Sequence, residues 1–220
     1  MSDSAFTLMS DYISSRPAPG AAAGVEFART DAEENALSVP SAATLSLLSA
    51  LAAGGSAAHG THGAVAVTPA AGAVGLSILH GLAEKAAVTC IDPEAAHQAS
   101  AREAFRLAGF PASRARFLTA RPLDVMGRLA PASYRLVYLD VDPVEFGPAI
   151  DVAWPLVAQG GTVVIAGSLL DGTVADPTRR DRATEAARAA DAAAEELSES
   201  GAATIARLPL DGGLTLITKR

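Results

Sequence analysis

The stretch GAVAVTPAAGAVGLSIL, residues 63–79, decides how the rest of the chain can be interpreted. It begins with a short apolar run that predicts a buried strand, and it continues through a tight turn into an apolar helix. In α/β proteins such a strand–turn–helix unit often holds a nucleotide-like cofactor at the turn. Here the turn is TPAAG, residues 68–72, where a glycine-rich loop is expected. The stretch therefore predicts an α/β fold and leaves open whether the turn binds a cofactor.

From this unit onward, short apolar runs alternate with helical segments. The expected strands are residues 64–68, 87–91, 115–118, 135–139 and 162–166. The expected helices are residues 72–84, 93–108, 122–129 and 143–157, with Pro93, Pro122 and Pro143 in first turns and with Gly109 and Gly160-Gly161 as stops. Short apolar runs bounded by turn residues are typical of buried parallel strands. The alternation predicts a parallel sheet with helices on both faces.

The two ends of the chain follow other patterns. Residues 4–14 predict a first helix, residues 14–24 a connector, and Ser41 the N-cap of a leucine-rich helix. Near the C-terminus the sequence predicts an alanine-rich helix and two extended runs, at residues 177–200, 202–210 and 214–220. The two runs are joined by Asp-Gly-Gly, so we expect a hairpin that makes one edge region of the sheet antiparallel.

The composition excludes several classes of protein. A length of 220 residues suits one domain, and a formal net charge of −7 argues against nucleic-acid binding, which needs a basic face. Cys90 is the only cysteine, and its apolar surroundings predict a small core side chain in a reducing compartment. Residues 1–17 contain acids and are not typical of a signal peptide, and prolines and glycines interrupt the uncharged residues 35–83. We therefore expect a soluble, cytoplasmic protein with no nucleic-acid or membrane partner.

Asp92 stands where the second expected strand ends. Ligands of open α/β sheets bind beyond the carboxyl ends of the strands, and an acid at this position can accept hydrogen bonds from ribose hydroxyls. The same carboxylate can cap the helix expected to start at Pro93, and both interpretations can hold together. Proteins that bind nicotinamide cofactors and proteins that bind S-adenosylmethionine share this arrangement, so Asp92 does not choose between them.

Asp140 and Asp142 stand one residue apart in LVYLDVDP, at the end of another expected strand. In an extended chain their side chains point the same way, which is unfavourable unless a cation, a donor or a proton compensates. We favour a functional use of the pair. The alternative is that Asp142 caps the helix at Pro143 while Asp140 is merely exposed.

The four histidines do not predict a metal site. His59 and His62 form an H-x-x-H pattern in a glycine-rich loop, where no further ligand is evident. His80 and His97 lie on expected helices and are interpreted as surface or packing residues. No Walker loop, nucleophile elbow or zinc signature is present.

A family resemblance is carried by segments distributed over most of the chain. They are SVPSAATLSLLSAL, AVTPAAGAVGLSIL, TCIDPE, RPLDVMGRLA, LVYLDVDP, LDGTVAD and RLPLDGGLTLITK. With these segments the chain from Val39 to Arg220 resembles the S-adenosylmethionine-dependent O-methyltransferases of the caffeoyl-CoA and catechol type. It is more closely similar to an actinobacterial and mycobacterial branch of O-methyltransferases.

The resemblance implies a class I methyltransferase fold, Rossmann-like and doubly wound. Its mostly parallel sheet would have about seven strands, with an antiparallel C-terminal strand. It also implies a methyltransferase-like domain over residues 39–220, preceded by an N-terminal helical cap or connector over residues 1–38, in a chain that is a single domain overall.

The resemblance also implies roles for individual residues. Cofactor contacts would be made by Val39, Ala66, Thr68, Pro69, Gly72, Val74, Asp92, Pro93, Pro122 and Asp142. Asp140 and Asp171 would contact the substrate, and Asp140 would also act as the catalytic base or as a ligand of a divalent metal such as Mg²⁺.

Several positions depart from the family pattern. Ala66 stands in place of an acid that anchors the amino-acid end of the cofactor, and Thr68 and Ala70 stand in place of glycines. Side chains at glycine positions limit how closely backbone N–H groups approach a ligand. Ala166-Gly167 replaces an Asp-Asn metal pair, so the set of oxygen ligands that Mg²⁺ needs is depleted.

The leading hypothesis is an S-adenosylmethionine-dependent O-methyltransferase acting on a small, hydroxylated, catechol-like acceptor, as a homodimer. The alternative is a catalytically degenerate homologue that serves as a binding or dimeric structural protein. A nicotinamide-dependent oxidoreductase ranks third, because no G-x-G-x-x-G follows the first strand.

Overall fold

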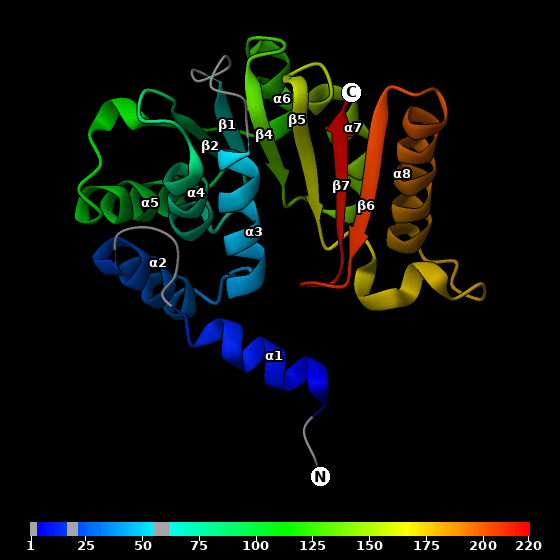
Figure 1. Ribbon diagram of the computed structural model, residues 1–220, viewed down its shortest axis with the longest axis horizontal. Coiled ribbons are helices and arrows are strands. Elements are labelled where there is room, and N and C mark those ends of the chain that lie inside the picture. Colours follow the sequence, from blue (N-terminus) through cyan, green and yellow to red (C-terminus); the bar gives the residue numbers. More distant parts are fainter. Residues whose placement is uncertain (1–3, 17–21, 55–61) are drawn as a thin grey trace.

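A seven-stranded sheet forms the centre of the molecule in the computed structural model, which describes residues 4–16, 22–54 and 62–220 (Figure 1). The strands are β1 Gly63–Val67, β2 Val88–Asp92, β3 Ala115–Thr119, β4 Tyr134–Leu139, β5 Val157–Ala166, β6 Ala203–Leu208 and β7 Leu214–Lys219. Their order is β3-β2-β1-β4-β5-β7-β6. β7 runs antiparallel to both of its neighbours, whereas the other pairs are parallel. The predicted fold class, with its antiparallel C-terminal strand, is confirmed.

Helices cover both faces of this sheet. They are α1 Ala5–Ser14, α2 Ala22–Glu34, α3 Ala42–Ala53, α4 Ala71–Gly81, α5 Ala95–Leu107, α6 Pro122–Val125, α7 Phe146–Ala153 and α8 Arg182–Glu199. α2, α3, α4 and α5 share one hydrophobic core with the sheet, and α7 and α8 share the other. None of the helices in the described ranges is both long and apolar enough to cross a membrane.

The alternation of side chains along β1 divides the two cores. Ala64 and Ala66 belong to the core under α3 and α4, whereas Val65 and Val67 belong to the core under α7. All four side chains are buried, as expected for a central parallel strand. Small alanines on the first face let helices pack close to the sheet.

Cys90 lies in the first of these cores and is fully buried. Burial in apolar surroundings disfavours the thiolate and raises the pKa of the thiol to about 12. The interpretation of Cys90 as a packing residue is confirmed.

Two local expectations are wrong. The helix expected over residues 143–157 is a short 3-10 turn, Pro143–Glu145, followed by α7, and Val157 already pairs with Tyr134 in the sheet. α7 ends at Ala153, two residues before Pro155, which has no backbone N–H to continue the helical hydrogen bonds. Gly160-Gly161 does not end a helix but lies inside β5, where Gly160 adopts a φ of 74° next to an irregular register with β4.

One helix start and the continuity of another helix also need correction. Pro93 precedes α5, which begins at Ala95, whereas Pro122 and Pro143 do begin helical turns as predicted. The expected helix over residues 122–129 is split into α6 and a 3-10 turn, Met126–Arg128.

The helix α2 was not predicted from the sequence. The expected connector at residues 14–24 overlaps its first turn, while residues 17–21 lie outside the described part of the chain. α2 packs against α4 and α5, and a Cβ atom at Gly72 would lie 3.0 Å from the Cβ of Ala28 and 3.3 Å from the Cβ of Ala104. Gly72 therefore allows close helix packing just behind the TPAAG turn.

We expect Gly81→Ala to destabilise the protein, because a Cβ there would lie 1.9 Å from the backbone oxygen of Ser49 in α3. α3 and α4 would have to move apart, at a cost of about 2 kcal/mol or more in the free energy of unfolding. Urea unfolding measures this change. Gly127→Ala is the control, since an added Cβ there meets no atom within 4 Å. Equal stability of the two variants would contradict the packing argument.

Candidate active site

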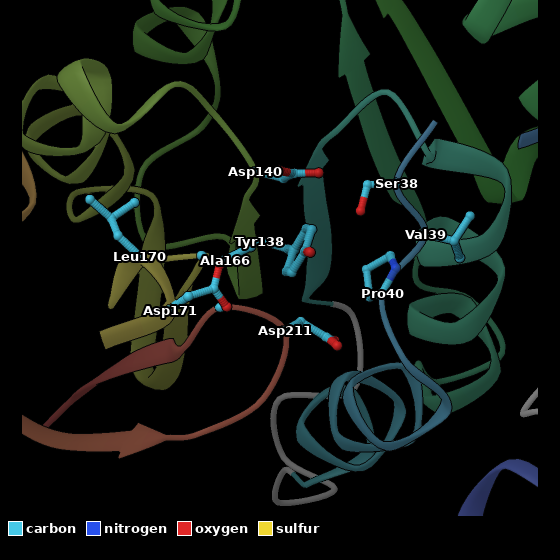
Figure 2. Close-up of a pocket in the computed structure, with 11 residues that line it drawn as sticks. Ser38, Val39, Pro40, Tyr138, Asp140, Ala166, Leu170, Asp171 and Asp211 are labelled. Atoms are coloured by element: carbon cyan, nitrogen blue, oxygen red, sulfur yellow. The ribbon is translucent and has the colours of Figure 1, made fainter. Parts of the chain in front are cut away.

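A cavity of about 400 Å³ opens beyond the carboxyl ends of β4 and β5 (Figure 2). It is lined by Ser38, Val39, Pro40, Tyr138, Asp140, Ala166, Gly167, Leu170, Asp171, Asp211 and Gly212. These residues come from the segment before α3, the end of β4, the stretch after β5 and the β6–β7 turn. The location is the one expected for a ligand site in an open α/β sheet, and the volume suits a small molecule.

Asp140 lies on one wall of this cavity, and its carboxylate is held by the TPAAG turn. The Oγ1 of Thr68 donates a hydrogen bond of 2.8 Å to Oδ2 of Asp140. The same Oγ1 accepts a bond of 3.2 Å from the backbone N–H of Ala70. The side chain that replaces a glycine of the family pattern therefore orients the predicted catalytic carboxylate, a contact that the sequence did not indicate.

The surroundings of Asp140 shift the pKa of its carboxyl group above the ordinary value. Burial raises the pKa of the Asp140 carboxyl, and the negative charge of Asp92 adds to this, whereas the Thr68 hydrogen bond opposes it. Asp140 is half-buried and is not merely exposed, so that part of the alternative is wrong.

Tyr138 brings a hydroxyl group to the same cavity. In Figure 2 its ring lies between Asp140 and Asp211. Burial, together with the charges of these two carboxylates, raises the pKa of the Tyr138 phenol. The hydroxyl therefore stays protonated at neutral pH and can donate a hydrogen bond to a ligand.

The segment before α3 is tied to the β6–β7 turn. Oδ2 of Asp211 accepts hydrogen bonds from the backbone N–H of Ser41 at 2.8 Å and from its hydroxyl at 3.0 Å. Ser41 in turn caps α3 through Thr44, as predicted. This contact closes one side of the cavity.

The same turn also holds the opposite wall. The backbone N–H of Asp171 donates to the carbonyl of Gly212, and that of Ser168 donates to the carbonyl of Gly213. Gly212 and Gly213 adopt φ angles of 76° and 100°, which L side chains rarely adopt. The two glycines thus let one turn bind both walls.

Asp92 is buried at the end of β2, about where the sequence placed it. Its Oδ1 accepts a bond of 2.7 Å from the backbone N–H of Glu94 and lies 3.0 Å from Nδ1 of His97. The capping interpretation is supported in modified form, because the carboxylate caps the turn that leads into α5. The contact between His97 and Asp92 was not indicated by the sequence.

Asp142 does not line the cavity that Asp140 lines. It is exposed, and its Oδ1 accepts a bond of 3.0 Å from the backbone N–H of Val144. The chain leaves the strand at Leu139 and turns into Pro143, so the extended backbone that the expectation assumed ends before Asp140. The alternative, in which Asp142 caps the following helical turn, is correct.

The other residues that were expected to contact the cofactor or the substrate lie in different surroundings. Val39 and Asp171 line the cavity together with Asp140. Ala66 and Val74 are fully buried in the core, Pro93 is exposed, and Pro122 begins α6. A second, smaller cavity lies behind the TPAAG turn, lined by Ala28, Asp31, Ala32, Leu37, Pro69, Ala70, Gly72, His97, Ser100 and Ala101.

A divalent metal does not fit the residues present. Within residues 4–16, 22–54 and 62–220, no group of three or more His, Cys, Asp or Glu side chains could hold one. Thr68 already occupies one oxygen of Asp140, and Ala166-Gly167 supplies no side-chain ligand. Of the H-x-x-H pair, His59 lies outside the described residues, so this pattern is not assessed.

The strand order and the cavity beyond the carboxyl ends of the strands define a class I methyltransferase architecture. No family model matches the sequence. A Mycobacterium tuberculosis protein named "probable O-methyltransferase" is 34% identical over 192 residues, covering 87% of this chain and 81% of the relative. The chain therefore belongs to this O-methyltransferase family.

Solved structures agree with this placement. A protein from Corynebacterium glutamicum superposes with a TM-score of 0.91 at 49% identity, covering 98% of this chain and 97% of that one. The O-methyltransferase TomG from Streptomyces achromogenes, solved in complex with SAM, gives a TM-score of 0.79 at 22% identity, with 96% of each chain covered. At that identity the second likeness shows a shared fold.

We expect Asp140→Asn to be more stable than the wild type at pH 7. The raised pKa means that the folded state binds the Asp140 proton more tightly than the unfolded state does. The free energy of unfolding therefore falls as the pH rises from about 4 through the folded-state pKa. Asparagine stays neutral and still accepts from Thr68, so it avoids this loss.

Urea unfolding at pH 7 and below pH 4 measures the effect, and the gain should disappear at the lower pH. Asp151→Asn, an exposed carboxylate on α7, is the matched control. A gain that is the same at both pH values would contradict the assignment to Asp140 ionisation.

Proposed function

We propose that the protein is an S-adenosylmethionine-dependent O-methyltransferase acting on a small, hydroxylated acceptor of catechol-like size. Membership of the O-methyltransferase family supports the reaction, and the complex of TomG with SAM supports the cofactor. The observation that carries the proposal is Asp140, half-buried and oriented by Thr68 on the wall of a cavity of about 400 Å³.

The cofactor would extend along the carboxyl ends of the strands. Asp92 would accept from the ribose hydroxyls, with Pro93 and Pro122 near the adenine and Val39 on the segment before α3. The TPAAG turn and the N-terminus of α4 would face the amino-acid end, where backbone N–H groups favour a carboxylate. Ala66 and Val74 are fully buried, so they would affect cofactor binding only through the shape of the core beneath the site. Asp142 would affect it through the turn that it caps.

Asp140 would act as the general base. When bound, S-adenosylmethionine supplies a sulfonium methyl group, and its C–S bond breaks as the new O–CH₃ bond forms. Asp140 accepts the proton of the acceptor hydroxyl, and its raised pKa brings it closer to the range useful for a base at neutral pH. Tyr138 and Asp171 orient the acceptor, and this positioning supplies much of the catalysis. No step requires a metal.

The rival function is a catalytically degenerate homologue that serves as a binding or dimeric structural protein. Thr68 and Ala70 favour it, because their side chains occupy positions at which glycines would let a ligand approach the backbone, and Pro69 removes one backbone N–H donor. The lack of an acid at Ala66 favours it as well.

Calorimetric titration with S-adenosylhomocysteine, followed by assay of a catechol panel, separates the two functions. We expect binding, and methyl transfer that neither EDTA nor added Mg²⁺ changes. Asp140→Asn should lower kcat about a hundredfold while S-adenosylhomocysteine still binds. Absence of any heat of binding would contradict the methyltransferase proposal. Binding without methyl transfer to any acceptor would favour the catalytically degenerate homologue.

We further propose that the protein is a cytoplasmic homodimer that associates through α1. This helix has no buried residue, and Phe6, Leu8, Met9 and Tyr12 are each more than half exposed. It extends away from the body of the molecule (Figure 1) and makes its main contacts with α3. An apolar surface of this kind is typical of a face that a second copy covers. The single, buried thiol agrees with a reducing compartment.

A double variant, Phe6→Ser with Met9→Ser, should therefore be monomeric in light scattering at concentrations at which the wild type is dimeric. Leu107→Ser is the control, because Leu107 is an exposed leucine on α5, away from α1. Dimerisation that survives the double variant would exclude α1 as the interface.

A further inference from the structure

His97 is a titratable side chain next to Asp92, at the proposed ribose end of the site, and the proposed reaction gives it no task. It lies in the first turn of α5 and reaches back to the end of β2, where its Nδ1 lies 3.0 Å from Oδ1 of Asp92. Its side chain is 22% exposed and that of Asp92 only 7%. The contact is thus a partly buried, charge-assisted pair rather than a solvated surface contact.

The direction of this hydrogen bond follows from the chemistry of the two groups. An ionised carboxylate only accepts hydrogen bonds, so Nδ1 of His97 carries the hydrogen and donates it. This holds for the protonated imidazole and for the neutral tautomer with hydrogen on Nδ1. The bond therefore does not depend on the charge of His97.

The two oxygens of Asp92 have different surroundings. Oδ1 accepts from His97 and from the backbone N–H of Glu94, whereas Oδ2 accepts from no donor in the described part of the chain. A carboxylate oxygen has room for about two donors, so Oδ1 is filled and Oδ2 remains the acceptor for a ligand. Rotation of the carboxylate would break both bonds to Oδ1, so His97 and Glu94 together hold Oδ2 in place.

The turn of α5 that carries His97 is itself fixed to the sheet. The fully buried Gln98 donates from Nε2 to the backbone carbonyl of Leu118 at 3.2 Å and to that of Cys90 at 3.4 Å. One turn further on, the hydroxyl of Ser100 donates to Asp31 of α2 at 2.6 Å. His97 is therefore presented by a rigid element, as a group that orients a binding carboxylate should be.

We propose that His97 is a positioning residue for ribose recognition, which holds Asp92 so that its Oδ2 accepts from the ribose hydroxyls of the cofactor. The inference rests on the proposed function, because it takes the ligand of Asp92 to be an adenosyl ribose. It adds to that function a role for His97, which would not touch the ribose itself but would act through Asp92.

The test is a comparison of two ligands by calorimetry, S-adenosylhomocysteine and its 2′-deoxyribose analogue. His97→Ala should weaken binding of S-adenosylhomocysteine about tenfold, the typical effect of losing one charge-assisted hydrogen bond. It should weaken binding of the deoxy analogue less, because that ligand lacks one of the two hydroxyls from which Oδ2 would accept. His97→Asn, whose amide N–H can replace the Nδ1 donor, should restore most of the affinity.

His80→Ala is the matched control, since His80 is an exposed histidine in the last turn of α4. Thermal unfolding of each variant checks that the fold is retained. If His97→Ala weakens both ligands equally or neither of them, His97 has only a structural role or none, and the inference is overturned while the proposed function stands. If the wild type binds neither ligand, the proposed function itself fails and the inference with it.

Discussion

The close approach of α3 and α4 to each other and to the sheet is the constraint on which the rest of the structure depends. It is possible because Gly81 lacks a Cβ where α4 meets the backbone of α3, and because alanines face these helices from β1. With larger side chains the helices would stand further from the sheet. The N-terminus of α3 would then not reach the β6–β7 turn, and the bond between Ser41 and Asp211 that closes the cavity would be lost.

In the TPAAG turn, a glycine serves helix packing and a side-chain hydrogen bond orients the site. The glycine that remains, Gly72, is used for packing against Ala28 of α2 and Ala104 of α5. Thr68 takes a glycine position and uses its hydroxyl to hold Asp140. The TPAAG turn thus orients Asp140 through the side chain of Thr68, whereas a glycine-rich loop would bind a ligand through its backbone N–H groups.

The sheet could be predicted because each parallel strand is a short apolar run with turn residues at both ends, as β1 and β4 show. The end of a strand also located Asp92 and Asp140 correctly, since it depends on local pattern alone. α2 was missed because it follows a stretch rich in proline and glycine and carries little apolar periodicity, so its stability comes from packing against α4 and α5.

The contacts that complete the site were beyond prediction for a different reason. Thr68 and Asp140 are 72 positions apart, and Ser41 and Asp211 are 170 apart, so no periodicity links them. His97 lies five positions after Asp92, which one helical turn can bridge, but the pattern alone does not distinguish this from an ordinary amphipathic helix. Spacing predicts which elements form, and tertiary packing decides which side chains meet.

The bond between Ser41 and Asp211 also bears on how the chain matures during synthesis. Everything from α3 to α8 is made before the turn that closes the cavity exists, so a nascent chain that ends before Asp211 has the sheet edge but not the enclosed site. A complete ligand site therefore needs the C-terminal hairpin as well as the central strands. Ligand affinity thus reports that the last hairpin has been translated and has inserted β7 between β5 and β6.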